Sequence, residues 1–216
     1  MTAAITGRSS VKVSAAAVDH LKVTAVAGTT AGVAFRITVT AQDAFNNTVT
    51  GYSGTVDFTS SDGQAGLPGD YTFTTTDKGV HTFSSVILRT AGTQTVTATD
   101  TATASVAGSA GIKVTAARAA SLRISAPASV THGVPFTFTV TVLDAFGNVA
   151  TGYTGTVHFT SSDSAASLPA DYRFIRSDAG VHTFSATLNT TGSQSLTATD
   201  RLTSGITGTD PGIQVV

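Results

Sequence analysis

Short runs of alternating hydrophobic and polar residues make up most of the chain. In the clearest run, residues 35–41 (FRITVTA), every second side chain is apolar and the residues between are Arg or Thr. This alternation is typical of an antiparallel strand that buries one face and exposes the other. Similar runs lie at 21–25, 56–58, 71–73, 81–87, 96–98 and 112–114, separated by turn residues. The pattern predicts about seven strands in a two-sheet sandwich.

The alternation also predicts which side chains form the interior. Val56 and Phe58 are expected to face inward, with Asp57 outward. Asn47 and Asn148 follow the second strand, where we expect a turn with left-handed backbone. Aromatic residues recur at matching positions of the two copies, and each copy is expected to bury about six or seven of them. In the run 81–87 the inward set is His81, Phe83, Ser85 and Ile87.

The chain is a tandem repeat of this unit. Residues 43–62 (DAFNNTVTGYSGTVDFTSSD) return largely unchanged as residues 144–163 (DAFGNVATGYTGTVHFTSSD), an offset of 101 residues. An offset of this size is that of a whole domain. We therefore predict one domain over residues 18–117 and a second over residues 118–216, each with its own core. The second copy lacks one residue before Gly192, and we expect this deletion to lie in a loop.

Two further segments bear on how the copies are arranged. Residues 115–121 (TAARAAS) join the copies without Gly or Pro, which predicts a fixed end-to-end arrangement. Residues 2–17 match residues 103–118, so residues 1–17 resemble the last strand of a preceding repeat, and the chain is then part of a longer array. The alternative is that Met1 is a natural start and this lead strand is a docking arm.

Composition favours strand and turn over helix. Threonine, which favours strands, is the most frequent residue, and all 13 acidic residues are Asp, which favours turns. The absence of cysteine excludes a disulfide framework and thiolate metal sites. The net charge of −1 offers no basic surface for nucleic acid, and no segment has the unbroken apolar length of a membrane span. We therefore expect neither nucleic-acid binding nor membrane insertion.

One recurring group of residues has the composition of a hydrolase triad. His81 lies near Asp77 and Ser84, and the group recurs as His182, Asp178 and Ser185. Alternation places His81 on the inner face and Ser84 on the outer, while Asp77 lies in a turn where it caps backbone N–H groups. A structural role is therefore predicted, with no catalytic residue and no enzyme activity.

Recurring aspartates are better candidates for a ligand site. Calcium binds several oxygen atoms, and loops at one end of a sandwich converge to supply them. Asp is also the commonest turn residue, however, and no DxDxDG run occurs. We expect no cofactor, with calcium as the alternative; its weak candidate ligands are Asp62, Asp70, Asp100, Asp163, Asp171 and Asp200.

The recurring motifs resemble those of a known family. At DAFGN, GYTGTVHFTSSD, LPADYRF, DAGVHTF and GSQSLTATD the chain is similar to bacterial immunoglobulin-like repeats of large secreted and surface proteins, broadly those of invasin and intimin. The resemblance implies an all-β fold of two tandem Ig-like antiparallel β-sandwich domains, arranged end to end. Unlike antibody domains, the chain has no Cys and no Trp. Gln94 and Gln194 take the corner position of a Tyr, where we expect them to bond to loop backbone.

The resemblance also implies an extracellular or cell-surface location. We expect a non-enzymatic structural module, a spacer or stalk of an adhesin-like protein, whose partners are adjacent Ig-like repeats of the same protein. Two alternatives stay open. The first is a binding module whose loops, at 62–70 or 100–111, recognise a cell-surface glycan or protein. The second is a filament subunit in which the lead strand, residues 4–13, completes the sheet edge of a neighbour.

Overall fold

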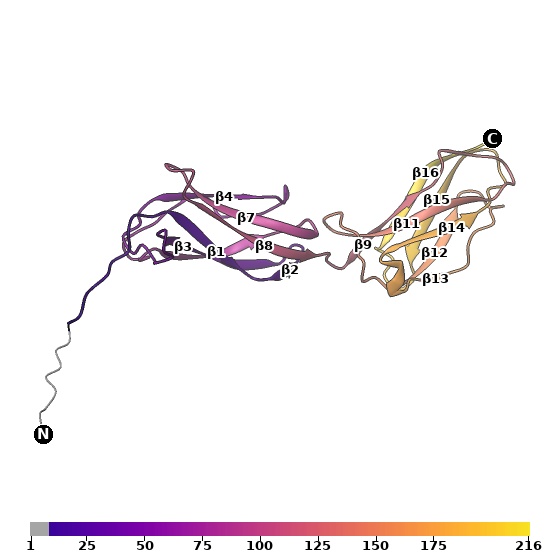
Figure 1. Cartoon of the computed structure of the whole chain (residues 1–216). Helices are drawn as coiled ribbons and strands as arrows, with labels where there is room; N and C mark the ends of the chain where they lie inside the picture. The colour runs from indigo at the N-terminus through magenta and orange to yellow at the C-terminus, as the bar shows by residue number, and fades with distance from the viewer. Residues whose placement is uncertain (1–8) are drawn as a thin grey trace, which may run out of the picture.

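Sixteen β-strands, in two sets of eight, lie in the part of the chain that the structure describes. The computed structural model describes residues 9–216 (Figure 1). The first repeat contains β1 (His20–Ala25), β2 (Gly28–Thr30), β3 (Ala34–Gln42), β4 (Thr55–Ser60), β5 (Tyr71–Thr72), β6 (Val80–Ile87), β7 (Gly92–Asp100) and β8 (Ala107–Thr115). The second contains β9 (Ala119–Ser125), β10 (Ser129–Val130), β11 (Phe136–Asp144), β12 (Thr156–Ser161), β13 (Tyr172–Arg173), β14 (Val181–Ala186), β15 (Gly192–Asp200) and β16 (Thr207–Val215), with a short 3-10 helix, η1 (Arg176–Asp178).

Each repeat is a sandwich of a three-stranded and a five-stranded sheet. The strand orders are β1-β3-β6 and β2-β8-β7-β4-β5 in the first repeat, and β9-β11-β14 and β10-β16-β15-β12-β13 in the second. This confirms the all-β, two-sandwich fold. Each repeat has one strand more than predicted, because β2 and β10 are short strands that pair parallel with β8 and β16. Strands of two or three residues carry too little alternation to be recognised in sequence.

Each sandwich has its own hydrophobic core. Phe58 belongs to the cluster of the first repeat and Phe159 to that of the second. Val56 and Phe58 are buried as predicted, because they alternate along β4 toward the facing sheet. Gln94 is also buried, and its amide donates to the carbonyl of Thr90 at 3.2 Å. Its predicted bond to loop backbone is thus confirmed, and Gln194 makes the same bond at 3.3 Å.

The predicted inner face of residues 81–87 is wrong in its second half. Phe35 pairs with Val86 and Ile37 with Phe83, so the one residue between them on β3 opposes two residues of β6, Ser84 and Ser85. The extra residue forms a β-bulge, which reverses the alternation. Val86 and Leu88 are therefore buried, in place of the expected Ser85 and Ile87.

The bulge also corrects the position of the deletion in the second copy. There Phe136 pairs with Ala186 and Phe138 with Phe184, with no extra residue between them. The residue missing from the second copy is therefore the bulged residue of a strand, and the predicted loop deletion is wrong. A strand tolerates this loss because the side chains on either side of the bulge keep their faces.

The expectation for the left-handed position in the turn after β3 is also wrong. The left-handed residues are Asn46 (φ 66°) and Gly147 (φ 85°), one position before the expected asparagines. Asn47 and Asn148 instead turn their side chains toward Asp43 and Asp144. Phe45 of the same turn is 78% exposed, so it does not belong to the buried aromatic set of the first repeat.

The lead segment lies only partly within the described residues. Residues 1–8 fall outside them, and with them half of the expected strand at 4–13. Residues 9–17 contain no strand. Their contact with the first sandwich includes a hydrogen bond of 2.9 Å from the N–H of Ala16 to Asp43.

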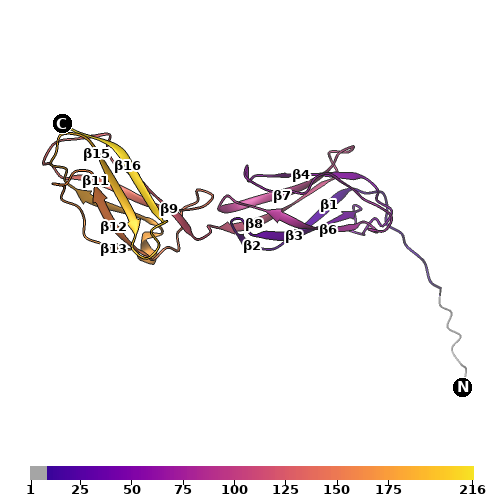
Figure 2. The same cartoon turned by 180° about the vertical axis from the view of Figure 1, so that it is seen from behind.

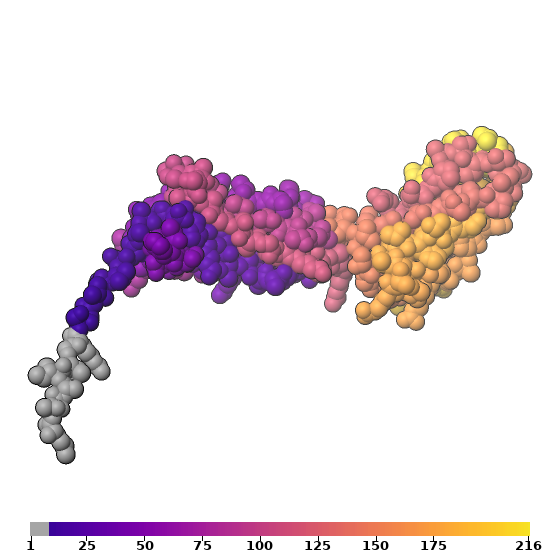
Figure 3. Space-filling model, viewed as in Figure 1, coloured from indigo at the N-terminus to yellow at the C-terminus, as the bar shows by residue number. Residues whose placement is uncertain are grey.

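The two sandwiches lie end to end. In Figures 1 and 2 the chain passes from β8 directly into β9, and the described segment before β1 and the terminal Val216 lie at opposite ends. Figure 3 shows an elongated molecule that narrows between the repeats. The residues at this narrow point therefore determine how the two halves are held.

Candidate functional site

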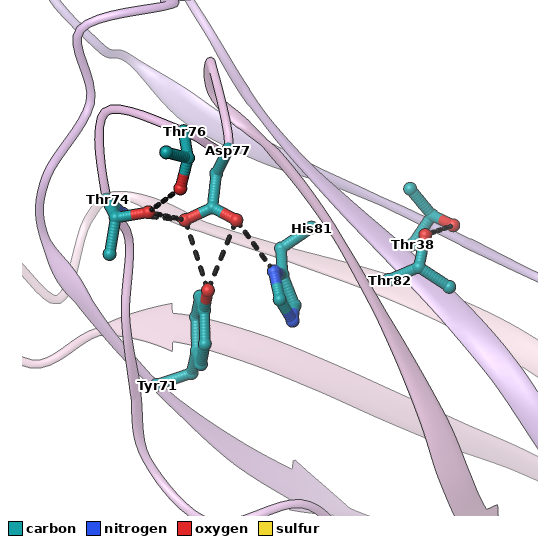
Figure 4. A network of polar contacts seen from close by, with 7 residues as sticks. All are labelled: Thr38, Tyr71, Thr74, Thr76, Asp77, His81 and Thr82. Atoms are coloured by element: carbon teal, nitrogen blue, oxygen red, sulfur yellow. Dashed lines mark hydrogen bonds and ion pairs between the residues drawn. The ribbon is translucent and has the colours of Figure 1, made fainter.

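The recurring histidine and aspartate form a compact polar cluster where β5, the turn before β6 and the start of β6 meet (Figure 4). Nδ1 of His81 lies 2.8 Å from Oδ1 of Asp77, and the hydroxyl of Tyr71 donates to the same carboxylate at 3.1 Å. The Tyr71 ring stacks on the imidazole with centroids 3.9 Å apart. The backbone N–H of Thr74 also donates to Asp77, at 2.6 Å. The second repeat has the same arrangement around Asp178.

This cluster fastens a turn, as the sequence predicted. The hydrogen bonds from His81, from Thr74 and from Tyr71 lower the pKa of Asp77, against the opposing effect of burial. Ser84 is exposed, on the opposite face of β6 from His81, so the structure does not bring a nucleophile to the imidazole. The carboxylate instead joins the turn before β6 to the side chains of β5 and β6.

The candidate calcium ligands are not brought together. Val56 pairs with Asp100 while Ser60 pairs with Val96, so Asp62 and Asp100 lie at opposite ends of the β4–β7 ladder. At about 3.3 Å per residue this separation is roughly 20 Å. Within residues 9–216, no three His or Asp side chains form a group that could hold a metal ion. The expectation of no cofactor, with calcium as its alternative, stays a prediction.

The candidate carboxylates at the ends of β7 and β15 are occupied by protein donors. Asp100 accepts hydrogen bonds from the hydroxyl of Tyr52 at 2.5 Å and from the N–H groups of Ala102 and Thr103, both at 2.8 Å. Asp200 accepts the same set from Tyr153, Leu202 and Thr203. Burial raises the pKa of Tyr52, and the neighbouring Asp100 raises it further. Each pair thus locks a loop to the core.

The Asp70 and Asp171 positions differ between the copies. Asp171 lies 2.7 Å from Nδ1 of His158 and pairs with Arg201. In the first repeat Asp57 and Thr101 stand in the places of His158 and Arg201, so Asp70 lacks these two partners. The Asp171 pairs are surface contacts of the second repeat.

The most extensive group of polar contacts lies at the narrow point between the repeats. We call this narrow point the junction. Here the side chain of Asn148 bridges the two sandwiches. Its Nδ2 donates to the carbonyl of Arg89 at 2.7 Å, and its Oδ1 accepts from the N–H of Ala91 at 2.8 Å. An amide that offers one donor and one acceptor to a peptide segment fixes both its position and its direction.

A carboxylate supports each side of this bridge. Asp62 accepts from the N–H groups of Arg89 at 2.6 Å and Thr90 at 3.0 Å, so it holds the loop that Asn148 grips. Asp144 accepts from Nδ2 of Asn148 at 2.9 Å and from the N–H of Ala117, in the linker, at 2.8 Å. The junction is therefore a continuous network from one repeat to the other.

The pKa of Asp62 reflects this network. Burial alone would raise it. Hydrogen bonds from Thr90, from Arg89 and from Gln64 outweigh burial and lower the pKa to about 2. The carboxylate is thus charged at neutral pH, and the bonds it accepts are charge-assisted, roughly twice as strong as neutral ones.

An apolar contact accompanies the polar bridge. Phe146, two residues before Asn148, packs against the core cluster of the first repeat. Its ring lies over Gly32, where an added Cβ would come within 2.5 Å of it. Gly32 also has φ +81°, a left-handed conformation that favours glycine. The backbone conformation and the nearby Phe146 ring therefore both require glycine at this position.

A groove of about 890 Å³ runs beside the junction. Small and polar residues line it, among them Thr30, Thr151 and Thr154, and Arg118 is its charged residue. The groove is not formed by the loops at 62–70 or 100–111 that the sequence suggested for ligand binding. It is open to solvent and has the character of a surface crevice between the repeats.

Sequence reasoning missed the junction. Phe45 and Phe146, and likewise Asn47 and Asn148, recur at the 101-residue offset within a turn, where an apolar ring has no core to enter. An aromatic residue that recurs in a polar turn is the signal that could have indicated a contact outside its own domain.

No family model matches the chain, and no curated protein matches it. Among solved structures, the Escherichia coli adhesin FdeC is 19% identical with a TM-score of 0.46, over 94% of this chain and 67% of that one. The Yersinia pseudotuberculosis adhesin InvE is 19% identical with a TM-score of 0.38, over 88% of this chain and 56% of that one. A family 2 glycosyl hydrolase of Bacteroides cellulosilyticus is 12% identical with a TM-score of 0.39, over 83% of this chain and 24% of that one.

The matched proteins thus include two bacterial adhesins and also an enzyme. The chain spans about half of InvE and about a quarter of the hydrolase. In residues 9–216 we find no helix with the length and apolar character needed to cross a membrane.

Proposed function

We propose that this chain is a non-enzymatic spacer module of a large, adhesin-like bacterial surface or secreted protein. Adjacent Ig-like repeats of the same protein are its partners, and the two sandwiches keep the parts on either side of them at a fixed separation. The observation that supports this most is the junction, where Asn148 and Phe146 of one turn make a polar and an apolar contact with the first repeat.

Approximate magnitudes support a single preferred orientation. Two hydrogen bonds contribute roughly 0.5–1.5 kcal/mol each. Full burial of a Phe ring contributes roughly 1.5–3 kcal/mol, and the half-buried ring of Phe146 contributes part of that. A preference of about 2.8 kcal/mol already corresponds to a hundredfold excess of one arrangement over its alternatives. A junction of this kind is therefore consistent with a stiff rod, and the extracellular location follows from the family resemblance.

Distance measurements between the repeats test the spacer function. The chain has no native cysteine, so a Thr59→Cys, Thr160→Cys double variant carries one spin label on each repeat. Double electron–electron resonance is expected to give a single narrow distance distribution. Adding Phe146→Ala and Asn148→Ala should broaden it, while Arg36→Ala, an exposed change on β3, should leave it unchanged. A broad distribution in the parent chain would refute a rigid spacer.

The groove supports a second candidate, a module that binds a cell-surface glycan or protein beside the junction. A glycan array separates the two functions, because a spacer should retain nothing. If a ligand is retained, Thr151→Trp should abolish binding by filling the groove. The equivalent Thr50→Trp, in the first repeat and outside the groove, should leave it unchanged.

A further inference from the structure

The outer end of the first repeat is the end that faces away from the junction. It carries the same residues that the second repeat contributes to the junction. Asp43, Phe45 and Asn47 are the counterparts of Asp144, Phe146 and Asn148. The N–H of Asn47 donates to Asp43 at 2.8 Å, as that of Asn148 donates to Asp144 at 2.9 Å. Asn47 Nδ2 also donates to Asp43 at 3.0 Å, the counterpart of the 2.9 Å bond from Asn148.

The chain also enters both repeats in the same way. The N–H of Ala16 donates to Oδ2 of Asp43 at 2.9 Å. Its counterpart Ala117 donates to Oδ2 of Asp144 at 2.8 Å. Ala16 therefore contacts Asp43 as the linker residue Ala117 contacts Asp144, although no sandwich lies before it in the described structure.

Apolar side chains at this end are uncovered where their counterparts are covered. Phe45 is 78% exposed, whereas Phe146 packs against the first repeat. Val11 and Val13 are 82% and 85% exposed, whereas their counterparts Ile112 and Val114 are buried in β8. This pattern is that of a surface whose partner is absent.

We infer that Asp43, Phe45 and Asn47 form a docking surface for the far end of a preceding repeat of the same type, joined through Ala16. This inference rests on the proposed function as a spacer within a longer array. The occupant must offer a glycine in the place of Gly32 for the ring of Phe45. It must also offer a carbonyl and an N–H in the places of Arg89 and Ala91 for the amide of Asn47.

A second copy of this chain fits that description less well. Its free end is that of the second repeat, where Gly133 (φ +72°) and Asp163 match Gly32 and Asp62. There His132 replaces Ala31, and its Nε2 lies 2.9 Å from the carbonyl of Asn189. That carbonyl is the counterpart of the one on Arg89, so the acceptor that Asn47 needs already receives one hydrogen bond within its own repeat. The geometry therefore favours, as the occupant, a repeat whose far end has the residues that the first repeat presents at the junction.

An extended chain tests this inference with the whole protein present. Residues 1–115 followed directly by residues 15–216 place a copy of the first repeat ahead of the original and keep the linker length. Spin labels at Thr59→Cys in both copies report the new junction. Labels at Thr59→Cys of the original copy and Thr160→Cys report the existing one.

We expect the new junction to give a distance distribution as narrow as the existing one. Phe45→Ala with Asn47→Ala in the original copy should broaden the new distribution only, and Phe146→Ala with Asn148→Ala the existing one only. Phe45→Ala alone keeps the test valid if the double variant unfolds, because Phe45 is exposed. A broad new junction beside a narrow existing one, or a new junction insensitive to Phe45→Ala, would overturn the inference and leave the spacer function standing.

Sedimentation of the unmodified chain tests the choice of occupant. We expect monomers over the full concentration range. End-to-end dimers that Phe45→Ala abolishes would show that a second copy occupies this surface after all.

Discussion

The hydroxyl of Tyr52 donates a hydrogen bond to the buried carboxylate of Asp100, 48 residues away, and joins the loop after β3 to the end of β7. The loops on both sides of this bond thereby become part of the core. Gly54 lies directly against the pair, where a Cβ would collide with both side chains. The second repeat keeps all three residues as Tyr153, Asp200 and Gly155.

Tyr52→Phe should destabilise the first repeat by roughly 1.5–3 kcal/mol, the usual contribution of a hydrogen bond to a charged group. The carboxylate of Asp100 then stays buried with backbone donors alone. Urea titration measures the change in the free energy of unfolding. Thr38→Val is the control, because its hydroxyl pairs with Thr82 on an exposed face and its loss should cost little. Equal losses in the two variants would contradict a special role for the buried pair.

Deletion of Ser85 should convert β6 into the regular geometry of β14. Val86 and Leu88 keep their buried faces when the bulge is removed, so the first repeat should fold with a loss below about 1 kcal/mol. The matched deletion of Ser185 shortens a strand that has no bulge. It forces Ala186 and Leu188 to the wrong face and should cost several kcal/mol. Thermal melts compare the two variants, and a Ser85 deletion as damaging as that of Ser185 would contradict the bulge.

Gly32→Ala should disturb the junction, since its Cβ meets the ring of Phe146. Gly133→Ala is a matched control. Both glycines have positive φ, so both substitutions should lower stability by about 1 kcal/mol. Among the described residues, the nearest atom to a Cβ on Gly133 is the side-chain oxygen of Asn189, at 3.8 Å. Only Gly32→Ala should broaden the Thr59–Thr160 distance distribution. The same distribution in both variants would contradict the Phe146 contact.

Acid should weaken the first repeat between about pH 4 and pH 2. The pKa of Asp62 is about 2 in the folded chain, below the ordinary value for Asp of about 3.9. The lowered pKa means that the unfolded chain binds protons first as pH falls. The stabilisation is thus complete above about pH 4 and is lost toward pH 2. Asp43, also with a pKa of about 2, adds to this loss.

The free energy of unfolding, measured by urea titration at several pH values, checks this dependence. Asp62→Asn should flatten it between pH 4 and pH 2 and lower stability at pH 7, because the side chain no longer carries charge to the N–H groups of Arg89 and Thr90. Asp57→Asn, on the outer face of β4, should change neither. An unchanged slope in the Asp62→Asn variant would disprove the assignment.

The sequence allowed most of the sandwich to be predicted, because burial on one face of a strand imposes a period of two on its side chains. Val56, Phe58 and Gln94 follow that rule directly. The bulge in β6 did not show, because Ser84 and Ser85 are both small and polar and either one satisfies the pattern. The short β2 stayed hidden because three residues carry no period.

The junction could not be predicted for a different reason. Alternation concerns the face that a strand turns toward its own core, whereas Phe146 and Asn148 lie in a turn and contact another domain. The recurring aspartates were identified, but many of their partners are backbone N–H groups, which every residue except proline possesses. Sequence spacing therefore showed that these aspartates recur. It did not indicate whether their carboxylates bind metal ions or the backbone of loops.

The parallel pairing of β2 with β8 has a mechanical consequence. When the two ends of a repeat are pulled apart, β8 leaves toward the junction while β2 is held back through β1, so the bonds from Gly28–Thr30 to Lys113–Thr115 are loaded in shear. Bonds loaded in this direction break together, whereas bonds at a peeled edge break in succession. Each sandwich should therefore resist tension along the rod far better than its modest number of bonds suggests.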